Sequence, residues 1–167
     1  TDCLDRIIEA MNGLSYEIVV ADAGSDDGTQ EVLESYRSRY QNIHFVTEAG
    51  SRGRGRRLCF KLSKGRYIIP MDIDIMLYPD KFRLMLSTYM ESEFRDTKCM
   101  ITALPSFSLV GIYPCRILQK VGGWRDLNYA EDVDILARLF LRDLVVTLPL
   151  HVYQEAELLS SEIYGSR

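Results

Sequence analysis

Two aspartates stand in an apolar setting within the segment RYIIPMDIDIMLY, which runs from Arg66 to Tyr78. The segment predicts a buried strand that ends at Asp72 and Asp74, so both side chains point the same way in an extended backbone. Burying a carboxylate is costly unless it is paired, hydrogen-bonded or bound to a metal. Hard oxygen ligands suit Mg²⁺ or Mn²⁺, which keep positions open for phosphates. The pair therefore predicts a metal-diphosphate site, and its alternative is a cap for the helix that begins at Pro79.

A third acidic position, Asp22, follows the apolar run Ile18 to Val20 and precedes Gly24. Such a run predicts a buried strand that feeds a loop, and glycine lets the backbone turn sharply there. The carboxylate of Asp22 has two candidate roles. It can accept hydrogen bonds from a nucleotide base or ribose, or it can form an Asx turn within its own loop. We expect Asp27 to cap the helix that follows.

Glu131, Asp132 and Asp134 open a strongly amphipathic helix. Acids in the first turn of a helix are favoured by the helix dipole and need no function. One of these carboxylates is nevertheless placed to act as a general base toward an acceptor hydroxyl. Just upstream, the turn Gly122-Gly123 carries Trp124, the single tryptophan of the chain, which we expect to form a wall for an apolar ring face.

The stretch from Arg52 to Arg66 concentrates positive charge in a protein of formal net charge −4. Its basic residues are Arg52, Arg54, Arg56, Arg57, Lys61, Lys64 and Arg66. Interleaved with glycines at the start of a helix, guanidinium groups and backbone N–H groups suit phosphate binding. RNA binding is a rival interpretation of an Arg-Gly run. For Lys61, Lys64 and Arg66 we expect a solvated helix face.

Strands and helices alternate along the chain, which predicts an α/β fold with a parallel sheet. The expected strands are the run 18–20, the strand that begins near Arg66 and ends at Asp72 and Asp74, and the segments 42–47, 98–106, 107–114 and 144–149. The expected helices cover 4–12, 27–40, the residues leading to 65, 79–93, 116–121 and the second half of 122–142. Ligands of such sheets bind beyond the carboxyl ends of the strands. The acidic and arginine-rich features all fall there.

Composition narrows the class of protein. The chain has 167 residues, 47% of them hydrophobic, which fits one domain with a real core. The sequence pI near 5.2 argues against nucleic-acid binding through the overall field. Four widely spaced cysteines predict buried thiols in a reducing compartment rather than a zinc site. Without a membrane-spanning run or signal peptide, we expect a cytoplasmic protein, with peripheral association at the inner face of a membrane left open.

Three segments, in this order, resemble the nucleotide-sugar-binding core of family 2 glycosyltransferases, the inverting enzymes of GT-A fold. They are EIVVADAGSDDGT, KGRYIIPMDID and VGGWRDLNYAEDVDILARL. Ala23 stands where the family has a second aspartate. The resemblance implies a three-layer α/β sandwich with a mostly parallel sheet, in a single catalytic domain over 1–167. It also implies that the family's first strand is missing before residue 1.

The resemblance also implies the roles of site residues. The substrate-binding set is Asp22, Ala23, Gly24, Arg56, Arg57, Asp72 and Trp124. Asp74 and Asp72 are the expected ligands of Mn²⁺ or Mg²⁺, and His151 is the candidate third ligand. Asp132 is the expected base toward the acceptor, with Glu131 beside it. Arg56 and Arg57 both fit the family position of an arginine before the D-x-D strand.

Two other functions compete with sugar transfer. A nucleotidyltransferase also uses a glycine- and arginine-containing loop with carboxylate-bound metal, but the long glycine-rich segment of that class is absent here. A non-catalytic RNA-binding domain built on the Arg-Gly run is the second, although no other basic patch extends the run. The expected donor is a nucleotide-diphospho-sugar. A polyprenyl phosphate, a glycan and a small metabolite all remain open as the acceptor.

Overall fold

The computed structural model describes residues 2–102 and 110–155. They fall into two compact units. Of the described residues, the first unit contains 2–14, 69–102, 110–112 and 145–155, and the second contains 15–68 and 113–144. The organisation as a single domain stays a prediction.

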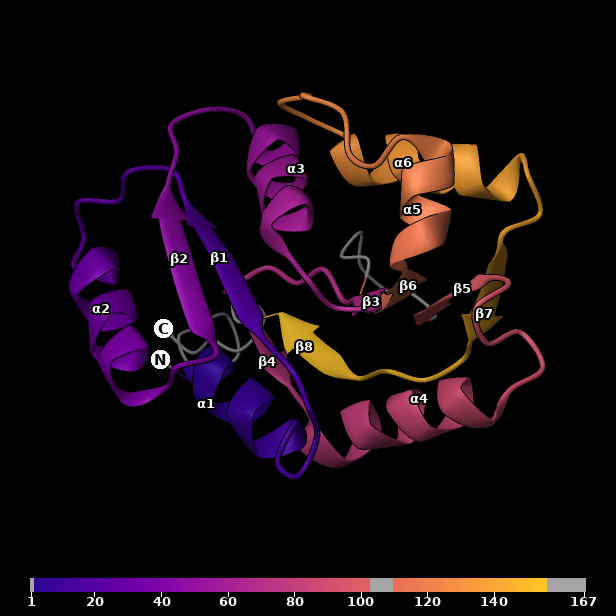
Figure 1. The fold of residues 1–167 in the computed structure, drawn as a ribbon, viewed down its shortest axis with the longest axis horizontal. Helices are drawn as coiled ribbons and strands as arrows, with labels where there is room; N and C mark the ends of the chain where they lie inside the picture. Colours follow the sequence, from indigo (N-terminus) through magenta and orange to yellow (C-terminus); the bar gives the residue numbers. More distant parts are fainter. Residues whose placement is uncertain (1, 103–109, 156–167) are drawn as a thin grey trace, which may run out of the picture. The chain divides into compact units, whose positions relative to one another are not determined.

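The second unit begins with a parallel pair of strands. β1 (Ile18–Asp22) lies in register with β2 (Ile43–Thr47), so that Asp22 is opposite Thr47 at their carboxyl ends. The crossover between them is α2 (Thr29–Arg39), which lies on one side of the pair while α3 (Arg52–Leu62) lies on the other (Figure 1). Asp27 accepts hydrogen bonds from the backbone and hydroxyl of Thr29. The N-cap residue is Gly28, so the prediction that Asp27 caps this helix is corrected: Asp27 precedes the cap and forms an Asx turn with Thr29.

The remaining elements of the second unit are β3 (Tyr67–Ile68), α5 (Cys115–Val121) and α6 (Glu131–Phe140). At Gly53 the backbone of α3 lies in close contact with the loop between α5 and α6. Its N–H donates to Leu127 O at 3.1 Å, and a Cβ at this position would lie 2.0 Å from Arg125 O. The loop carbonyl thus satisfies one of the N–H groups that a helix start leaves without an intrahelical partner.

The first unit packs α1 (Asp2–Ala10) beside β4 (Ile75–Leu77) and α4 (Pro79–Glu91), as Figure 1 shows. Pro79 starts α4, as predicted. It also contains the strands β5 (Cys99–Thr102), β7 (Val145–Leu148) and β8 (Tyr153–Glu155). β5 pairs with β7 in parallel, whereas β4 and β8 are antiparallel. The core includes Phe82, Met85, Tyr89 and Ile101, all buried.

β6 (Gly111–Pro114) has residues in both units. In the first unit its Gly111 and Ile112 pair antiparallel with β5, and in the second its Tyr113 and Pro114 pair antiparallel with β3. The α/β class is confirmed. The pairing is mixed where the sequence predicts a mostly parallel sheet, and the short strand β8 was not predicted.

The prediction of one continuous strand from about Arg66 to Asp72 and Asp74 was wrong. β3 ends at Ile68, residues 69–72 have no regular structure, and Ile73 and Asp74 form a turn before β4. Pro70 offers no backbone N–H to a neighbouring strand, which is a physical reason for the break. The expected strands over 98–106 and 107–114 are confirmed as β5 and β6, and their parts at 103–109 lie outside the described residues.

Candidate active site

The acidic pair that opens α6 faces an arginine from α3. Glu131 and Asp132 are both buried, with 5% and 9% of their surface exposed. Arg56 Nη2 lies 2.8 Å from Asp132 Oδ2, and Arg56 Nε lies 3.5 Å from Glu131 Oε1. Two buried carboxylates at a helix N-terminus are tolerable because the dipole and this guanidinium both compensate their charge.

Trp124 supplies a second donor to the same carboxylate. Its indole Nε1–H donates to Asp132 Oδ1 at 3.0 Å, and its ring packs against Phe60 and Tyr113 with centroids 6.2 and 6.1 Å away. The side chain is almost fully buried. Trp124 was expected to form a wall for an apolar ring face. The structure instead buries the ring, and its indole N–H contacts Asp132.

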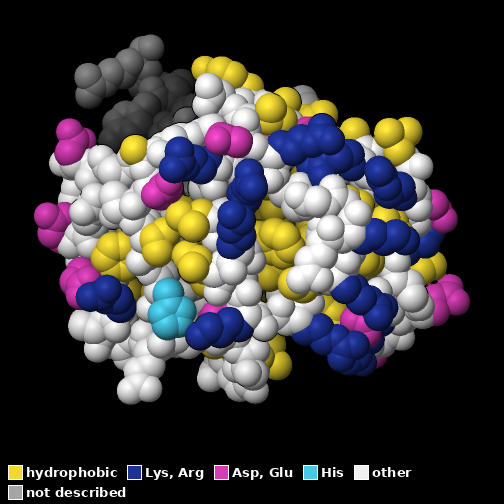
Figure 2. Space-filling view, turned by 45° about the horizontal axis from the view of Figure 1, so that its top comes forward, with side chains coloured by type: hydrophobic (Ala, Val, Ile, Leu, Met, Phe, Trp, Pro, Cys, Tyr) yellow, Lys and Arg dark blue, Asp and Glu magenta, His cyan; other side chains and the backbone are white. Residues whose placement is uncertain are grey.

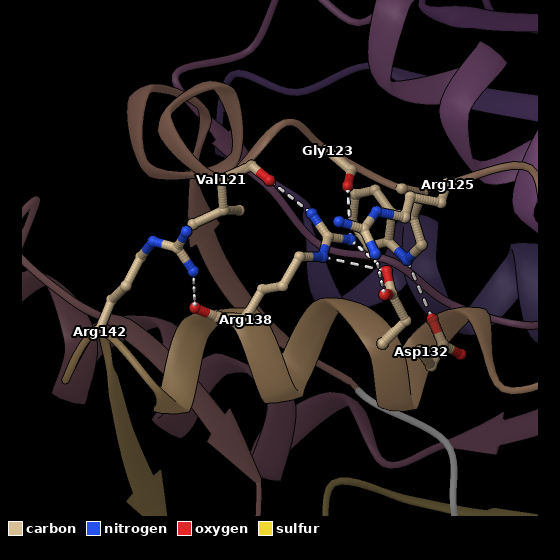
Figure 3. A network of polar contacts seen from close by, with 8 residues as sticks. Val121, Gly123, Arg125, Asp132, Arg138 and Arg142 are labelled. Atoms are coloured by element: carbon tan, nitrogen blue, oxygen red, sulfur yellow. Dashed lines mark hydrogen bonds and ion pairs between the residues drawn. The ribbon is translucent and has the colours of Figure 1, made fainter.

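Arg138 also belongs to this site; it stands at the arginine position of the third motif segment, but no role was predicted for it from the sequence. Figure 3 shows it reaching from α6 to the backbone carbonyls of Val121 and Gly123. It also donates to Asp134 Oδ2, whose partner oxygen Oδ1 accepts from Arg125 at 2.9 Å. The signal lay in the segment EDVDILARL, where Asp134 and Arg138 stand four residues apart on one helix face.

Asp22 is buried at the end of β1 and its carboxylate serves its own loop. Oδ2 accepts from Gly24 N at 3.0 Å and from Gln30 Nε2 at 3.0 Å, and Oδ1 accepts from Ser25 Oγ at 2.6 Å. These bonds, the Ser25 hydroxyl first, hold the pKa of Asp22 below its usual range against the opposing effect of burial. The structure therefore shows the Asx-turn alternative, while Ala23 and Gly24 stand exposed beside it.

Asp22→Asn is expected to lower the free energy of unfolding at neutral pH by about 1–3 kcal/mol. The amide replaces one carboxylate oxygen, which accepts hydrogen bonds, by an NH₂ group that would face the donors of the loop. The folded-state pKa is lowered, so the contribution is complete above the unfolded-state pKa and disappears as pH falls through the folded-state value. Urea titrations between pH 7 and pH 3 check this. The exposed Asp26→Asn serves as control, and a constant difference between Asp22→Asn and wild type at every pH would contradict the account.

The structure separates Arg56 from Arg57. Arg56 faces the acidic pair, whereas Arg57 is exposed and lines an open cavity of about 310 Å³. The other lining residues are Glu48, Arg54, Leu58, Lys61 and Asp126. Arg54 is ion-paired with Glu48 there. Lys and Arg side chains stand out over much of the face shown in Figure 2, although the net charge of the chain is −4.

Asp72 and Asp74 lie in the first unit, Asp72 just before the turn that precedes β4 and Asp74 on it. Asp72 is half-buried and Asp74 is exposed, so neither carries the burial cost that the apolar sequence suggested. α1 anchors this segment: the Cys3 thiol donates to Asp72 O at 3.9 Å, and Arg6 donates to Leu77 O at 3.2 Å. Burial raises the pKa of Cys3 to about 11, with Asp74 and Asp72 adding to the rise. The thiol is therefore neutral and able to donate.

His151 is exposed between β7 and β8. Within residues 2–102 and 110–155 no three His, Cys, Asp or Glu side chains come close enough together to hold a metal ion. The structure thus does not bring His151 together with Asp72 and Asp74. The two aspartates still offer hard carboxylate oxygens two residues apart in the segment before β4, which is the donor set that Mg²⁺ and Mn²⁺ accept alongside substrate oxygens.

None of the helices in the described part of the chain combines the length and the apolar character needed to cross a bilayer.

Comparison with known proteins finds glycosyltransferases among the relatives of this chain. The profile of "Glycosyl transferase family 2" matches residues 1–103. Poly(ribitol-phosphate) beta-glucosyltransferase of Bacillus spizizenii is 31% identical over 78 residues, 44% of this chain and 12% of that protein. Dolichyl-phosphate beta-glucosyltransferase ALG5A of Trichomonas vaginalis is 26% identical over 133 residues, 71% of this chain and 41% of that protein. The chain thus spans less than half the length of these relatives.

Solved structures show the same fold. S. aureus TarS 1-349 superposes with a TM-score of 0.74 at 17% identity, covering 91% of this chain and 54% of that one. The mannosyltransferase PcManGT from Pyrobaculum calidifontis, in complex with GDP-Man and Mn²⁺, has a TM-score of 0.68 at 14% identity, covering 87% and 49%. The GT-A fold that the sequence implies is confirmed. Because the family profile covers more than half of its residues, the chain belongs to glycosyl transferase family 2.

Proposed function

We propose that this chain is the core of an inverting glycosyltransferase, which moves a sugar from a nucleotide-diphospho-sugar to an acceptor hydroxyl or phosphate. Membership in family 2 favours this function over nucleotidyl transfer and over RNA binding. The observation that carries the proposal is the buried carboxylate of Asp132. It is held by Arg56 on one oxygen and by Trp124 on the other, an arrangement that suits a base with one fixed orientation.

The proposed reaction is a single displacement. The acceptor oxygen attacks the anomeric carbon while the bond from that carbon to the diphosphate oxygen breaks, and its electron pair leaves with the diphosphate. Asp132 takes the proton of the acceptor. Glu131 keeps the neighbouring charge that holds Arg56 in place. Inversion at the anomeric carbon follows, because attack and departure take place on opposite faces.

Two separate roles in donor binding are proposed: Asp72 and Asp74 of the first unit bind the ribose and the metal-diphosphate, and the loop of Asp22, Ala23 and Gly24 of the second unit serves the nucleotide. A divalent ion bound by Asp74 and Asp72 would neutralise charge on the diphosphate. The likeness to PcManGT, solved with GDP-Man and Mn²⁺, supports this assignment. In this account Asp22 acts by shaping the loop, since its carboxylate is occupied by loop donors. Arg57, exposed on α3, is proposed to contact the donor phosphates.

The acceptor is proposed to carry phosphate. The two relatives named above are a dolichyl-phosphate beta-glucosyltransferase and a poly(ribitol-phosphate) beta-glucosyltransferase. A phosphate on a lipid or on a polyol is the chemistry that these two names share. Assays that compare a polyprenyl phosphate, a ribitol-phosphate oligomer and a neutral glycan separate the possibilities.

Donor binding is tested by a thermal-shift panel of UDP-, GDP- and dTDP-sugars with Mn²⁺ or Mg²⁺. A ligand at 100 times its Kd stabilises the folded state by about 2.7 kcal/mol. We expect one nucleotide class to raise Tm in the presence of metal, and Asp74→Asn to remove the metal-dependent part of that shift. Asp80→Asn, on the exposed first turn of α4, is the control. An unchanged shift in Asp74→Asn would contradict the assignment.

A further inference from the structure

We propose that Arg138 is a positioning residue for Asp132, acting through the Gly122-Gly123 turn and the indole of Trp124. Its catalytic consequence rests on the function proposed above, but its structural part does not. Arg138 lies six residues after Asp132 on the same helix and does not touch the carboxylate of Asp132 among the contacts described above. Its influence therefore has to pass through the turn.

Arg138 holds the turn on both sides. Its guanidinium donates to Val121 O, before the two glycines, and to Gly123 O at 2.8 Å, the carbonyl that leads into Trp124 (Figure 3). The side chain is buried, with 9% of the residue exposed. A cation at the end of α5 is well placed, because the last carbonyls of a helix lack intrahelical partners and carry its negative dipole end.

The turn itself has little freedom to shift. Gly122 and Gly123 both have left-handed backbones, with φ of 85° and 62°. Their N–H groups close the end of α5 by donating to Gln119 O and Leu118 O. A Cβ at Gly123 would lie 3.0 Å from the ring of Phe60. Held in this way, the backbone enters Trp124 in one direction only.

Trp124 then returns to the start of α6. Its N–H donates to Asp132 Oδ1 at 3.0 Å, and Arg56 donates to Oδ2 at 2.8 Å. Arg138 of α6 thus donates to the Gly122-Gly123 turn. Trp124, which follows that turn, donates back to Asp132 at the start of α6. Without Arg138 the indole loses the turn that fixes its direction, and Asp132 loses the indole N–H that orients Oδ1.

Arg125 supplies a matched control. It pairs with Oδ1 of the same Asp134 that Arg138 contacts through Oδ2. Among the contacts described for residues 2–102 and 110–155, Arg125 makes no side-chain hydrogen bond to a carbonyl of the turn. Arg125→Gln therefore weakens the ion pairing of Asp134 and leaves the hydrogen bonds from Arg138 to Val121 O and Gly123 O in place.

Fluorescence of Trp124, the single tryptophan, tests the structural part without any substrate. In Arg138→Gln we expect a red-shifted emission and stronger quenching by acrylamide at a temperature where circular dichroism shows a folded chain. Arg138→Lys, which keeps the charge but not the planar fork, is expected to lie between Arg138→Gln and wild type, and Arg125→Gln is expected to match wild type. Should Arg138→Gln not fold, Arg138→Lys decides. Wild-type emission and quenching in the folded variant would overturn the proposal.

A double-mutant cycle tests the catalytic part. Arg138→Gln is expected to lower kcat by roughly tenfold to a hundredfold with the KM for the donor unchanged. In a Trp124→Phe background the same change is expected to have no further effect, because both act through one contact. Additive losses would overturn the positioning role. If wild type shows no transfer at all, the proposed function fails, and the fluorescence of Arg138→Gln still decides the role of Arg138.

Discussion

Asp132→Asn is expected to lower kcat for sugar transfer by about 10²- to 10⁴-fold, the usual contribution of a general base. The amide can still accept from Trp124 through its remaining oxygen, so the packing of the ring is retained. It cannot take up the acceptor proton. Donor binding, measured as the thermal shift with nucleotide-sugar and metal, is expected to stay close to wild type.

The control for Asp132→Asn is Glu31→Gln, another acid in the first turn of a helix of the same unit, exposed on α2. If carboxylates at helix starts act only through the dipole, both substitutions have small effects. A large loss of kcat in Asp132→Asn alone supports the base. Equal, small losses in both variants would show that Asp132 is not the base.

Gly53→Ala is expected to cost about 3 kcal/mol or more of unfolding free energy, the upper end of the usual cost of overpacking. The new Cβ would lie 2.0 Å from Arg125 O and 2.7 Å from Leu127 N. Both are backbone atoms, so neither moves without displacing the loop that joins Trp124 to Asp132. For a domain of this size Tm falls by about 2–4 °C per kcal/mol.

Gly55→Ala, two residues along α3, is the matched control for Gly53→Ala. Its new Cβ meets only the Cβ of Ala21, at 3.6 Å, which is an ordinary contact. Alanine also favours a helix over glycine by about 1 kcal/mol. Calorimetry should therefore find Gly55→Ala at least as stable as wild type, and a similar loss of Tm in both variants would contradict the close approach at Gly53.

The α/β class and the acidic helix α6 could be predicted from the sequence. The β-branched run at Ile18 and the helical periodicity of α6 are local signals, and both elements form where they predict. Pairing partners are not local. The antiparallel pairs of β3, β4 and β6 and the short strand β8 depend on contacts far apart in sequence.

The site shows the same division between local and distant signals. The motif spacing fitted Arg56 and Arg57 equally well as the arginine before the D-x-D segment. Adjacent residues on a helix point to different faces, and the spacing does not tell which face meets the acidic pair. The structure assigns Arg56 to the acidic pair. For Asp72 and Asp74 the apolar neighbours suggested a strand, yet Pro70 and the turn at Asp74 interrupt it. Trp124 was expected to form a wall for an apolar ring face, whereas the burial of its ring depends on tertiary packing with Phe60.

The anomeric configuration of the transferred sugar tests the central claim most directly. The nucleotide-α-sugar selected by the thermal-shift panel is incubated with metal and a phosphate-bearing acceptor, and NMR of the product gives the linkage. A single displacement assisted by Asp132 predicts a β-linked product that forms with wild type and Arg125→Gln and is nearly absent with Asp132→Asn. An α-linked product, or a β-linked product formed equally fast by Asp132→Asn, would contradict the account.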